Sequence, residues 1–404
     1  MTTARTRNPL AFLDAEIEQL RQKGLFRRLR VVESEQRSRC LIDGREVITL
    51  SSNNYLGLTT HPRLRRAAIE AVERYGAGSG AVRTIAGTMS LHEDLEARLA
   101  AFKHTEAVLT FQSGFTANTG VIPVLAAEGA VIVSDALNHA SIIDGIRLSR
   151  AERKVFPHAD IDALRGALRE VRAADGGAHR SILVITDGVF SMDGDIAKLP
   201  EIVEAAEEAD AIVMVDDAHA SGVLGRNGRG SVDHFDLHGR VHVQVGTLSK
   251  AIGVLGGYVA GPASLRTVLE HRARPFLFST SHPPAVAAAC LAAIDVLESE
   301  PELIDRLWEN ARHFKAGLDR IGFDTGASET PITPVLVGTS DVAQRMSRRL
   351  FEEGVFATSV VYPTVPLDGA RIRTIVSSEH TIDELDIAID AFARVGRELH
   401  LIDA

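Results

Sequence analysis

Lys250 is the residue of this chain whose surroundings best suit covalent chemistry. It lies in the segment 246–251 (GTLSKA), which follows the alternating run 241–245 and contains no other charge. A lysine just beyond a buried strand has a desolvated ammonium group, and desolvation lowers its pKa. A neutral amine attacks a carbonyl carbon and forms a Schiff base with an aldehyde. A solvated loop lysine is the alternative interpretation, and the rest of the sequence decides between the two.

Four further polar clusters each follow a strand-like run of apolar residues. They are 112–118 (QSGFTAN), 134–141 (SDALNHAS), 186–194 (TDGVFSMDG) and 215–219 (VDDAH). In a parallel sheet, ligands bind beyond the carboxyl ends of the strands, where such clusters gather. The recurrence predicts one site that contains all four clusters and Lys250.

An aldehyde cofactor such as pyridoxal phosphate needs partners of particular types, and the clusters contain them. A buried carboxylate, here Asp216, keeps a pyridinium nitrogen protonated, and the ring of His139 could stack on the cofactor. His219 and Ser191 could reach the phenolic oxygen. A phosphate binds to backbone N–H and hydroxyl groups near the start of a helix. For this role the chain offers Ser113, Gly114, Phe115 and Thr247.

The composition is that of an ordinary globular protein and excludes several functions. Of 404 residues, 45% are hydrophobic and 24% charged, so the chain can bury a large core, and its length suggests two or three structural units. A net charge of −10 argues against a nucleic-acid or anionic-membrane partner. The most apolar stretch, 285–297, contains Asp295 and is too short to span a bilayer.

Cysteine and histidine usage predicts a cytoplasmic protein without a metal site. Cys40 and Cys290 are far apart and form no C-x-x-C pattern, so we expect neither a disulfide nor a cysteine zinc site. The fifteen histidines are scattered, without H-E-x-x-H or paired helical spacing. Residues 1–9 contain Arg5 and Arg7 but no apolar segment typical of a secretory signal.

Strand-like runs alternate with helical patterns from about residue 106 onward. The strand-like runs are 107–111, 130–134, 181–186, 211–215 and 241–245, and helical periodicity marks 161–174 and 199–209. This alternation predicts an α/β domain whose large, mostly parallel sheet is covered by helices on both faces. We assign residues 46–284 to this domain.

The pattern changes after Pro283-Pro284, where we expect a smaller C-terminal α+β domain over residues 285–404. Its predicted elements are a long helix with Leu307 and Phe314 inward, a strand over 332–337, a helix that ends at Gly354, strands over 355–362 and 370–376, and a last helix behind a capping box at Thr381. Residues 1–45 are expected to form an N-terminal helix and arm. The apolar stripe of that helix consists of Leu13, Ile17 and Leu20.

Two segments in the first part of the chain have other interpretations. The glycine-rich run 76–80 lacks the spacing of a dinucleotide-binding turn, and we expect a flexible loop that approaches a ligand or a partner subunit. The run 90–93 (SLHE) predicts a capping box at the start of a helix, with His92 at the surface of its first turn.

As a set, the clusters resemble the α-oxoamine synthases, a branch of the fold-type-I pyridoxal-phosphate enzymes. The resemblance extends from about residue 45 to 400, and it implies the fold of an aspartate aminotransferase-like transferase. Within the family, the segments 138–145 (NHASIIDG), 187–194 (DGVFSMDG) and 227–230 (NGRG) look most like glycine C-acetyltransferase, also called 2-amino-3-ketobutyrate CoA ligase.

The resemblance implies a role for each residue of the site. Lys250 would hold pyridoxal 5'-phosphate as a Schiff base, Asp216 would pair with its ring nitrogen and His139 would stack on the ring. Ser191 and His219 would bond its phenolic oxygen. A homodimer is implied, because the residues that would hold the phosphate include two from the other subunit. The phosphate would be held by Gly114, Phe115 and Thr247 of one subunit and by Ser279 and Thr280 of the other.

A clamp for the substrate carboxylate is also implied. Arg371 and Arg373 would lie on one face of a strand, and a planar guanidinium suits bidentate binding of a carboxylate. The resemblance favours Arg373, together with Asn54, for this task.

The implied activity is that of a C-acyltransferase, which condenses glycine with acetyl-CoA to give 2-amino-3-oxobutyrate and CoA. The nearest alternative is an 8-amino-7-oxononanoate synthase, or a broad-specificity synthase, that uses alanine and a longer acyl-CoA. Val82, near the presumed amino-acid pocket, does not separate glycine from alanine. Ordinary aminotransfer is a more distant alternative. A non-catalytic subunit of a heteromeric synthase is disfavoured, because Lys250 and its partners are present.

Overall fold

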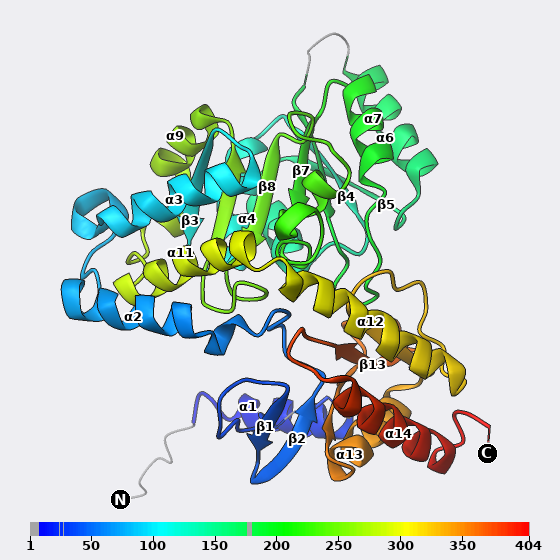
Figure 1. Cartoon of the computed structure of the whole chain (residues 1–404). Coiled ribbons are helices and arrows are strands. Elements are labelled where there is room, and N and C mark those ends of the chain that lie inside the picture. The colour runs from blue at the N-terminus through cyan, green and yellow to red at the C-terminus, as the bar shows by residue number, and fades with distance from the viewer. Residues whose placement is uncertain (1–7, 24, 27, 176–179, 404) are drawn as a thin grey trace, which may run out of the picture.

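The computed structural model describes residues 8–23, 25–26, 28–175 and 180–403. Its centre is a seven-stranded sheet in the order β3-β9-β8-β7-β6-β4-β5, in which β9 runs antiparallel to both neighbours and the remaining pairs are parallel (Figure 1). The strands are β3 (Ala107–Phe111), β4 (Val131–Asp135), β5 (Glu152–Phe156), β6 (Ile182–Asp187), β7 (Ile212–Asp216), β8 (Val243–Thr247) and β9 (Gly257–Gly261). The prediction of a mostly parallel sheet is confirmed.

Two of these strands, β5 and β9, lack the sequence signal of a buried strand. β5 lies at the edge of the sheet, and its first residues, Glu152 and Arg153, are exposed. β9 is fully buried but begins and ends at glycine, a residue with a low propensity for strands. Neither strand was therefore predicted.

Side chains alternate between the two faces of the sheet, and each face packs against its own set of helices. On β4, Val131 and Val133 join one apolar cluster, whereas Ile132 joins the other. The first cluster lies under α6 (Ile161–Ala174), α7 (Leu199–Glu208) and α8 (Ser231–His234). The second lies under α4 (Gly114–Leu125), α5 (Ala140–Leu148), α9 (Ala263–Arg272) and α10 (Arg274–Leu277). Both faces are covered, as expected for such a sheet.

A third group of helices, α2 (Pro62–Tyr75), α3 (Ser90–Lys103) and α11 (Pro284–Ser299), packs together beside the sheet. The start of α3 differs from the prediction. His92 is buried, not at the surface: its Nδ1 accepts the Met89 N–H at 3.0 Å, and its Nε2 lies 2.9 Å from the carbonyl oxygen of His282. The histidine, rather than a Ser90–Glu93 box, therefore caps the helix.

The C-terminal part contains two small sheets and three helices. One sheet has the antiparallel order β10 (Ile332–Gly338), β13 (Ala370–Ile375), β12 (Thr358–Val360). In the other, the hairpin β1 (Arg39–Ile42) and β2 (Arg45–Thr49) pairs with β11 (Val355–Phe356). The helices are α12 (Glu302–Arg320), α13 (Ser340–Glu352) and α14 (Ile382–Glu398). The short helical turns η1 (Leu58–Thr60), η2 (Arg83–Gly87) and η3 (Arg226–Gly228) lie earlier in the chain. The boundary between 284 and 285 stays a prediction.

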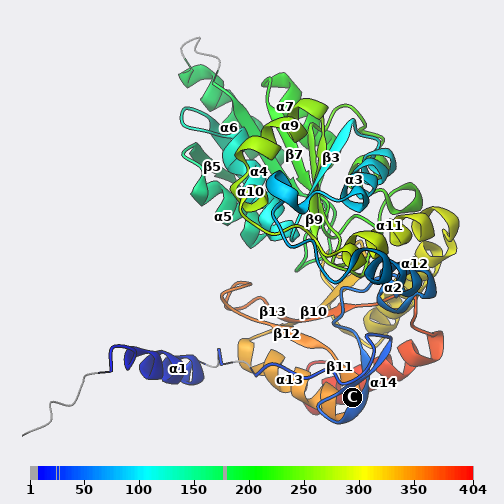
Figure 2. The ribbon, with the colours of Figure 1, turned by 90° about the vertical axis from the view of Figure 1, so that its left-hand side faces the viewer.

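The N-terminal helix α1 (Phe12–Gln22) stands away from the rest of the chain (Figure 2). It buries none of its residues, and the predicted stripe of Leu13, Ile17 and Leu20 is 39–44% exposed. Residues 1–7 of the predicted arm lie outside the described residues. Among the helices that the structure describes, none combines the length and apolar character needed to cross a membrane.

Lys103, at the end of α3, forms a fully buried ion pair with Asp217, one residue beyond β7. The Nζ to Oδ2 distance is 3.0 Å, and both side chains have 0% exposure. Replacing Lys103 with methionine should lower the free energy of unfolding by about 3–5 kcal/mol, because the Asp217 carboxylate would stay buried without its counter-charge. Urea denaturation measures this loss.

The matched control is Lys154→Met, which removes an exposed pair with Glu170 and should leave the urea midpoint unchanged. Adding Asp217→Asn to the Lys103→Met chain should recover part of the lost stability. Equal midpoints for the Lys103 and Lys154 variants would contradict the importance of the buried pair.

Candidate active site

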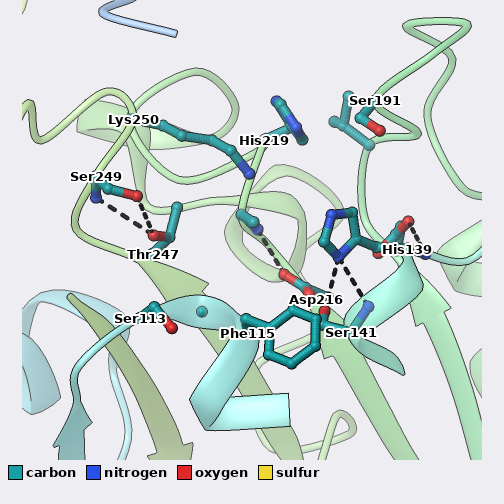
Figure 3. Close-up of a pocket in the computed structure, with 14 residues that line it drawn as sticks. Ser113, Phe115, His139, Ser141, Ser191, Asp216, His219, Thr247, Ser249 and Lys250 are labelled. Carbon is teal, nitrogen blue, oxygen red and sulfur yellow. Dashed lines mark hydrogen bonds between the residues drawn. The ribbon is translucent and has the colours of Figure 1, made fainter. Parts of the chain in front are cut away.

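A pocket of about 230 Å³ opens at the carboxyl ends of β6, β7 and β8, beside the first turn of α4 (Figure 3). It is lined by Ser113, Gly114, Phe115, His139, Ser141, Asp187, Val189, Ser191, Asp216, Ala218, His219, Thr247, Ser249 and Lys250. The fold therefore brings the four polar clusters and Lys250 to one place, although they are spread over 138 positions from Ser113 to Lys250.

Asp187 and Asp216 are the last residues of the neighbouring strands β6 and β7, and they stand opposite each other in register. Burial, together with the negative charge of Asp216, raises the pKa of Asp187 well above its ordinary value. The Asp216 carboxylate accepts hydrogen bonds from the Ala218 N–H at 2.9 Å and from Asn118 Nδ2 at 2.6 Å. These two contacts fix the orientation of the Asp216 carboxylate at the base of the pocket.

A chain of hydrogen bonds connects Asp216 to the imidazole of His139. Asn118 Nδ2 donates to Asp216 and also lies 2.9 Å from Ser141 Oγ, which is 2.7 Å from His139 Nδ1. The Ser141 N–H also donates to Nδ1, at 3.2 Å. Because Nδ1 accepts, the proton of the neutral ring resides on Nε2, which is free to donate into the pocket. Burial and the charge of Lys250 lower the pKa of His139, while Asp216 opposes them, so the ring is neutral near pH 7.

The amine of Lys250 points into the same pocket (Figure 3). Burial lowers its pKa from 10.5 to about 8; the charges of Asp216 and Asp187 oppose this shift, and Arg373 adds to it. The solvated-loop interpretation of Lys250 is therefore wrong. A lysine with this pKa has a usable fraction of neutral amine at neutral pH.

His219 is held by a residue from outside the clusters. The Tyr55 hydroxyl lies 2.8 Å from His219 Nδ1, and both side chains are buried. Burial, followed by the charges of Lys250 and Arg373, lowers the pKa of His219 well below its ordinary value. The ring is therefore neutral, and the tyrosine fixes its orientation.

The first turn of α4 forms a cradle for an anion at one end of the pocket. Ser113 caps the helix through its hydroxyl, and the leading N–H groups of a helix, here those of Gly114 and Phe115, have no acceptor within it. A Cβ on Gly257 would lie 2.3 Å from the Ser113 carbonyl oxygen, so only glycine allows β9 to pass this close to the turn. The hydroxyls of Thr247 and Ser249 lie on the pocket wall. A phosphate at this end, with Asp216 and Lys250 further in, matches the donors that pyridoxal phosphate requires.

The two arginines of β13 both reach the loop after β6. Arg373 is half-buried, and its Nε donates to the Ser191 carbonyl at 2.5 Å, which places it beside the pocket. Arg371 instead forms an ion pair with Asp193. Asn54 lies apart from the pocket lining and donates to the Gln36 carbonyl and to Thr59 Oγ1.

Two predicted phosphate ligands do not line the pocket of their own chain. Thr280 is exposed, and its carbonyl accepts a hydrogen bond from Gln112; Ser279 precedes it. Conversely, several residues of the site had no predicted role. Asn118, Ser141, Asp187 and Ser249 lie within or beside the predicted clusters, whereas Tyr55 lies outside them. Asn118 and Tyr55 act through contacts that only the fold creates.

Comparison with known proteins gives the class of this chain. The profile of the aminotransferase class I and II family matches residues 45–392. The 8-amino-7-oxononanoate synthase of Symbiobacterium thermophilum is 64% identical, over 97% of this chain and 99% of the relative. That of Thermoanaerobacter pseudethanolicus is 59% identical, over 97% and 98%. A serine palmitoyltransferase from S. paucimobilis, solved with bound PLP-myriocin aldimine, is 32% identical and superposes with a TM-score of 0.91 over 98% of this chain and 100% of that one.

The chain belongs to the aminotransferase class I and II family of fold type I, as its sheet and pocket indicate. Within this family it is an α-oxoamine synthase, a transferase that depends on pyridoxal 5'-phosphate. The narrower resemblance to glycine C-acetyltransferase is corrected, because the relatives with 59–64% identity are named 8-amino-7-oxononanoate synthases. Two of the three segments that suggested the narrower assignment, 138–145 and 187–194, contribute residues to the pocket, whereas 227–230 lies outside its lining.

The rate at which the cofactor-free chain takes up pyridoxal phosphate should rise with pH, with a midpoint near pH 8. Only the neutral amine attacks the aldehyde, and the pKa of Lys250 is lowered to about 8, so roughly one-tenth is neutral at pH 7. The change in absorbance after mixing measures the rate. The same measurement on a Lys250→Ala chain gives the contribution of Schiff bases on exposed lysines, which is subtracted. A rise only around pH 10.5, as for an unperturbed lysine, would contradict the effect of burial.

Proposed function

We propose that this enzyme condenses alanine with a seven-carbon dicarboxylic acyl-CoA to give 8-amino-7-oxononanoate, CoA and carbon dioxide. The carbon count of the product dictates these substrates. Its ketone carbon and the six beyond it derive from the acyl group, which ends in a carboxylate. The amino-bearing carbon and the methyl group derive from alanine, whose carboxyl group is lost as carbon dioxide. The names of the relatives with 59–64% identity support this assignment.

One observation supports acyl transfer to an amino acid most directly: Lys250, with a pKa lowered to about 8, lies in the same pocket as the Asp216 carboxylate and the neutral His139. When bound, pyridoxal phosphate supplies an electron sink that stabilises negative charge at the amino-acid Cα. The Lys250 amine takes the Cα proton. Asp216 provides the negative charge that keeps the sink protonated.

His139 is the proposed donor to the thioester oxygen. Its Nδ1 accepts from Ser141, so its Nε2–H is oriented into the pocket, where negative charge develops on the acyl oxygen as the new carbon–carbon bond forms. The half-buried guanidinium of Arg373, beside the pocket, binds the amino-acid carboxylate. Asn54 assists only if its amide leaves Thr59, because the present contact is 2.7 Å.

The remaining contacts hold the cofactor. Gly114, Phe115 and Thr247 bind its phosphate, with Ser113 as helix cap, and Ser191 and His219 bond its phenolic oxygen. We further propose a homodimer in which Ser279 and Thr280 complete the phosphate site of the neighbouring subunit. Their position outside the pocket of their own chain supports this arrangement.

The homodimer predicts that the purified enzyme has twice the 43.5 kDa chain mass in solution. Light scattering measures this mass, and Thr280→Ala should weaken phosphate binding and raise the free cofactor concentration needed for full activity without changing the mass. A monomer that binds the cofactor with undiminished affinity would contradict the completed site.

The reaction itself is tested by CoA thiol release. Alanine, glycine and serine are each paired with acetyl-CoA and with the seven-carbon dicarboxylic acyl-CoA. We expect the fastest release with alanine and the dicarboxylic thioester, together with carbon dioxide from labelled alanine carboxyl groups. Faster release with glycine and acetyl-CoA would overturn the proposed substrates but not the enzyme class. No release with any pair would overturn acyl transfer.

A further inference from the structure

Three potential metal ligands, from two segments that are distant in sequence, meet on the surface. His104 follows the last residue of α3, while Asp233 lies in α8 and His238 just beyond it. One ligand atom from each lies within 4.8 Å of those of the other two. The Asp233–His238 separation of five residues gave no recognised metal pattern, and the third residue precedes Asp233 by 129 positions. No metal site was therefore predicted from the sequence.

The distances within the cluster suit coordination. His238 Nε2 lies 3.2 Å from Asp233 Oδ1, close to the roughly 3.3 Å between two ligands on one tetrahedral zinc ion with bonds of about 2.0–2.1 Å. The two imidazole rings lie 4.8 Å apart, centroid to centroid, and His104 is exposed, so its ring can turn toward the pair. His238 Nδ1 is buried and has no hydrogen-bond partner among the described residues.

Charged side chains near the cluster act on a bound cation in both directions. The Asp233 carboxylate favours a cation. The side chains of Arg226 and Arg229 oppose a cation. Arg229 is partly compensated by Glu298, 3.7 Å away.

We propose that His104, Asp233 and His238 bind a Zn²⁺ ion, with water in the fourth position. Two imidazoles and a carboxylate form a ligand set that binds zinc in preference to magnesium or calcium, because the latter two ions favour oxygen ligands. Asp233 Oδ2 already accepts the Arg226 N–H at 2.6 Å, the kind of outer contact that orients a metal-binding carboxylate.

The ion would join two segments that enclose the buried Lys103–Asp217 pair. His104 is adjacent to Lys103, and Ser231 of α8 donates its N–H and hydroxyl to Asp217. A bound ion thus holds the end of α3 against α8 on the outer side of this pair. Its expected effect is on the stability of the protein, since the three ligands lie outside the pocket lining.

The test uses the cofactor-loaded enzyme, free of any histidine tag and stripped with EDTA. Calorimetric titration with Zn²⁺ should give one ion per chain, and zinc should raise the Tm. His104→Asn, which suits the left-handed backbone at φ 53°, and His238→Gln should each weaken binding at least tenfold and abolish the rise in Tm. The control His271→Gln replaces another exposed histidine and should bind zinc as the unmodified chain does.

CoA release distinguishes this site from zinc binding in the pocket. Zinc at the proposed site should leave turnover unchanged. Zinc that inhibits turnover and binds both variants with unaltered affinity would place the ion elsewhere and overturn the proposal. The absence of saturable binding to the unmodified enzyme would overturn it as well.

Discussion

Replacing Lys250 with alanine should reduce CoA release by about 10⁴-fold, the upper end of what a positioned acid–base group contributes. The amine has two tasks, covalent attachment of the cofactor and removal of the Cα proton, and alanine can perform neither. No other lysine lines the described pocket, so no neighbour substitutes for it. Borohydride reduction followed by peptide mass spectrometry should find the pyridoxyl group on Lys250 in the unmodified enzyme and on no pocket residue of the variant.

The matched control is Lys198→Ala, which removes an exposed lysine. Its ammonium group donates a hydrogen bond to the Ala159 carbonyl and lies outside the pocket lining. This variant should retain normal turnover and normal attachment. If the Lys250→Ala chain released CoA at the control rate, the proposed centre of the reaction would be wrong. Added methylamine, a small base that fits the space left by the side chain, should restore part of the activity if proton transfer limits the variant.

Local signals in the sequence were sufficient to predict most of the scaffold. The strands that end at Asp187, Asp216 and Thr247 are short apolar runs followed by polar residues, and the parallel sheet brings such ends together. The capping box of α14 is confirmed, because Thr381 Oγ1 accepts the Glu384 N–H and Glu384 Oε2 accepts the Thr381 N–H. These features depend on residues a few positions apart.

What the sequence did not reveal depends on contacts between distant residues. Tyr55 meets His219 across 164 positions, and Asn118 meets Asp216 across 98. His92 was predicted at the surface because its spacing fits a first helical turn, yet its burial depends on the His282 carbonyl, 190 positions away. No local pattern contains such pairs.

Substrate choice is a limit of a different kind. Glycine and alanine differ by one methyl group, and such a difference in a pocket is worth only about 1–3 kcal/mol. The segments 138–145 and 187–194 contribute residues to the pocket in which the cofactor would bind, and they favoured an assignment that the relatives do not support.

Replacing Asp216 with asparagine should reduce turnover by about 10²–10³-fold and weaken retention of the cofactor. The substitution preserves the shape of the side chain but removes the negative charge that would hold the ring nitrogen protonated, and a preorganised electrostatic contact of this kind is worth that much. CoA release and the cofactor remaining after dialysis measure the two effects. Asn118→Ala keeps the charge of Asp216 and removes the 2.6 Å contact to it, together with the 2.9 Å contact to Ser141, so its effect should be smaller.

The pH dependence of cofactor uptake separates loss of charge from loss of shape. Asp216 stabilises the protonated form of Lys250 and thereby raises its pKa against the effect of burial. Without that charge the pKa of Lys250 falls further, so the midpoint of uptake in Asp216→Asn should move below pH 8. The charge of Asp216 also raises the pKa of Asp187, which should fall in the same variant and so ionise more readily. An ionised Asp187 would return part of the lost charge, and the shift should therefore be larger in the Asp216→Asn, Asp187→Asn double variant. Normal turnover with an unmoved midpoint in Asp216→Asn would show that the carboxylate does not act on this pocket.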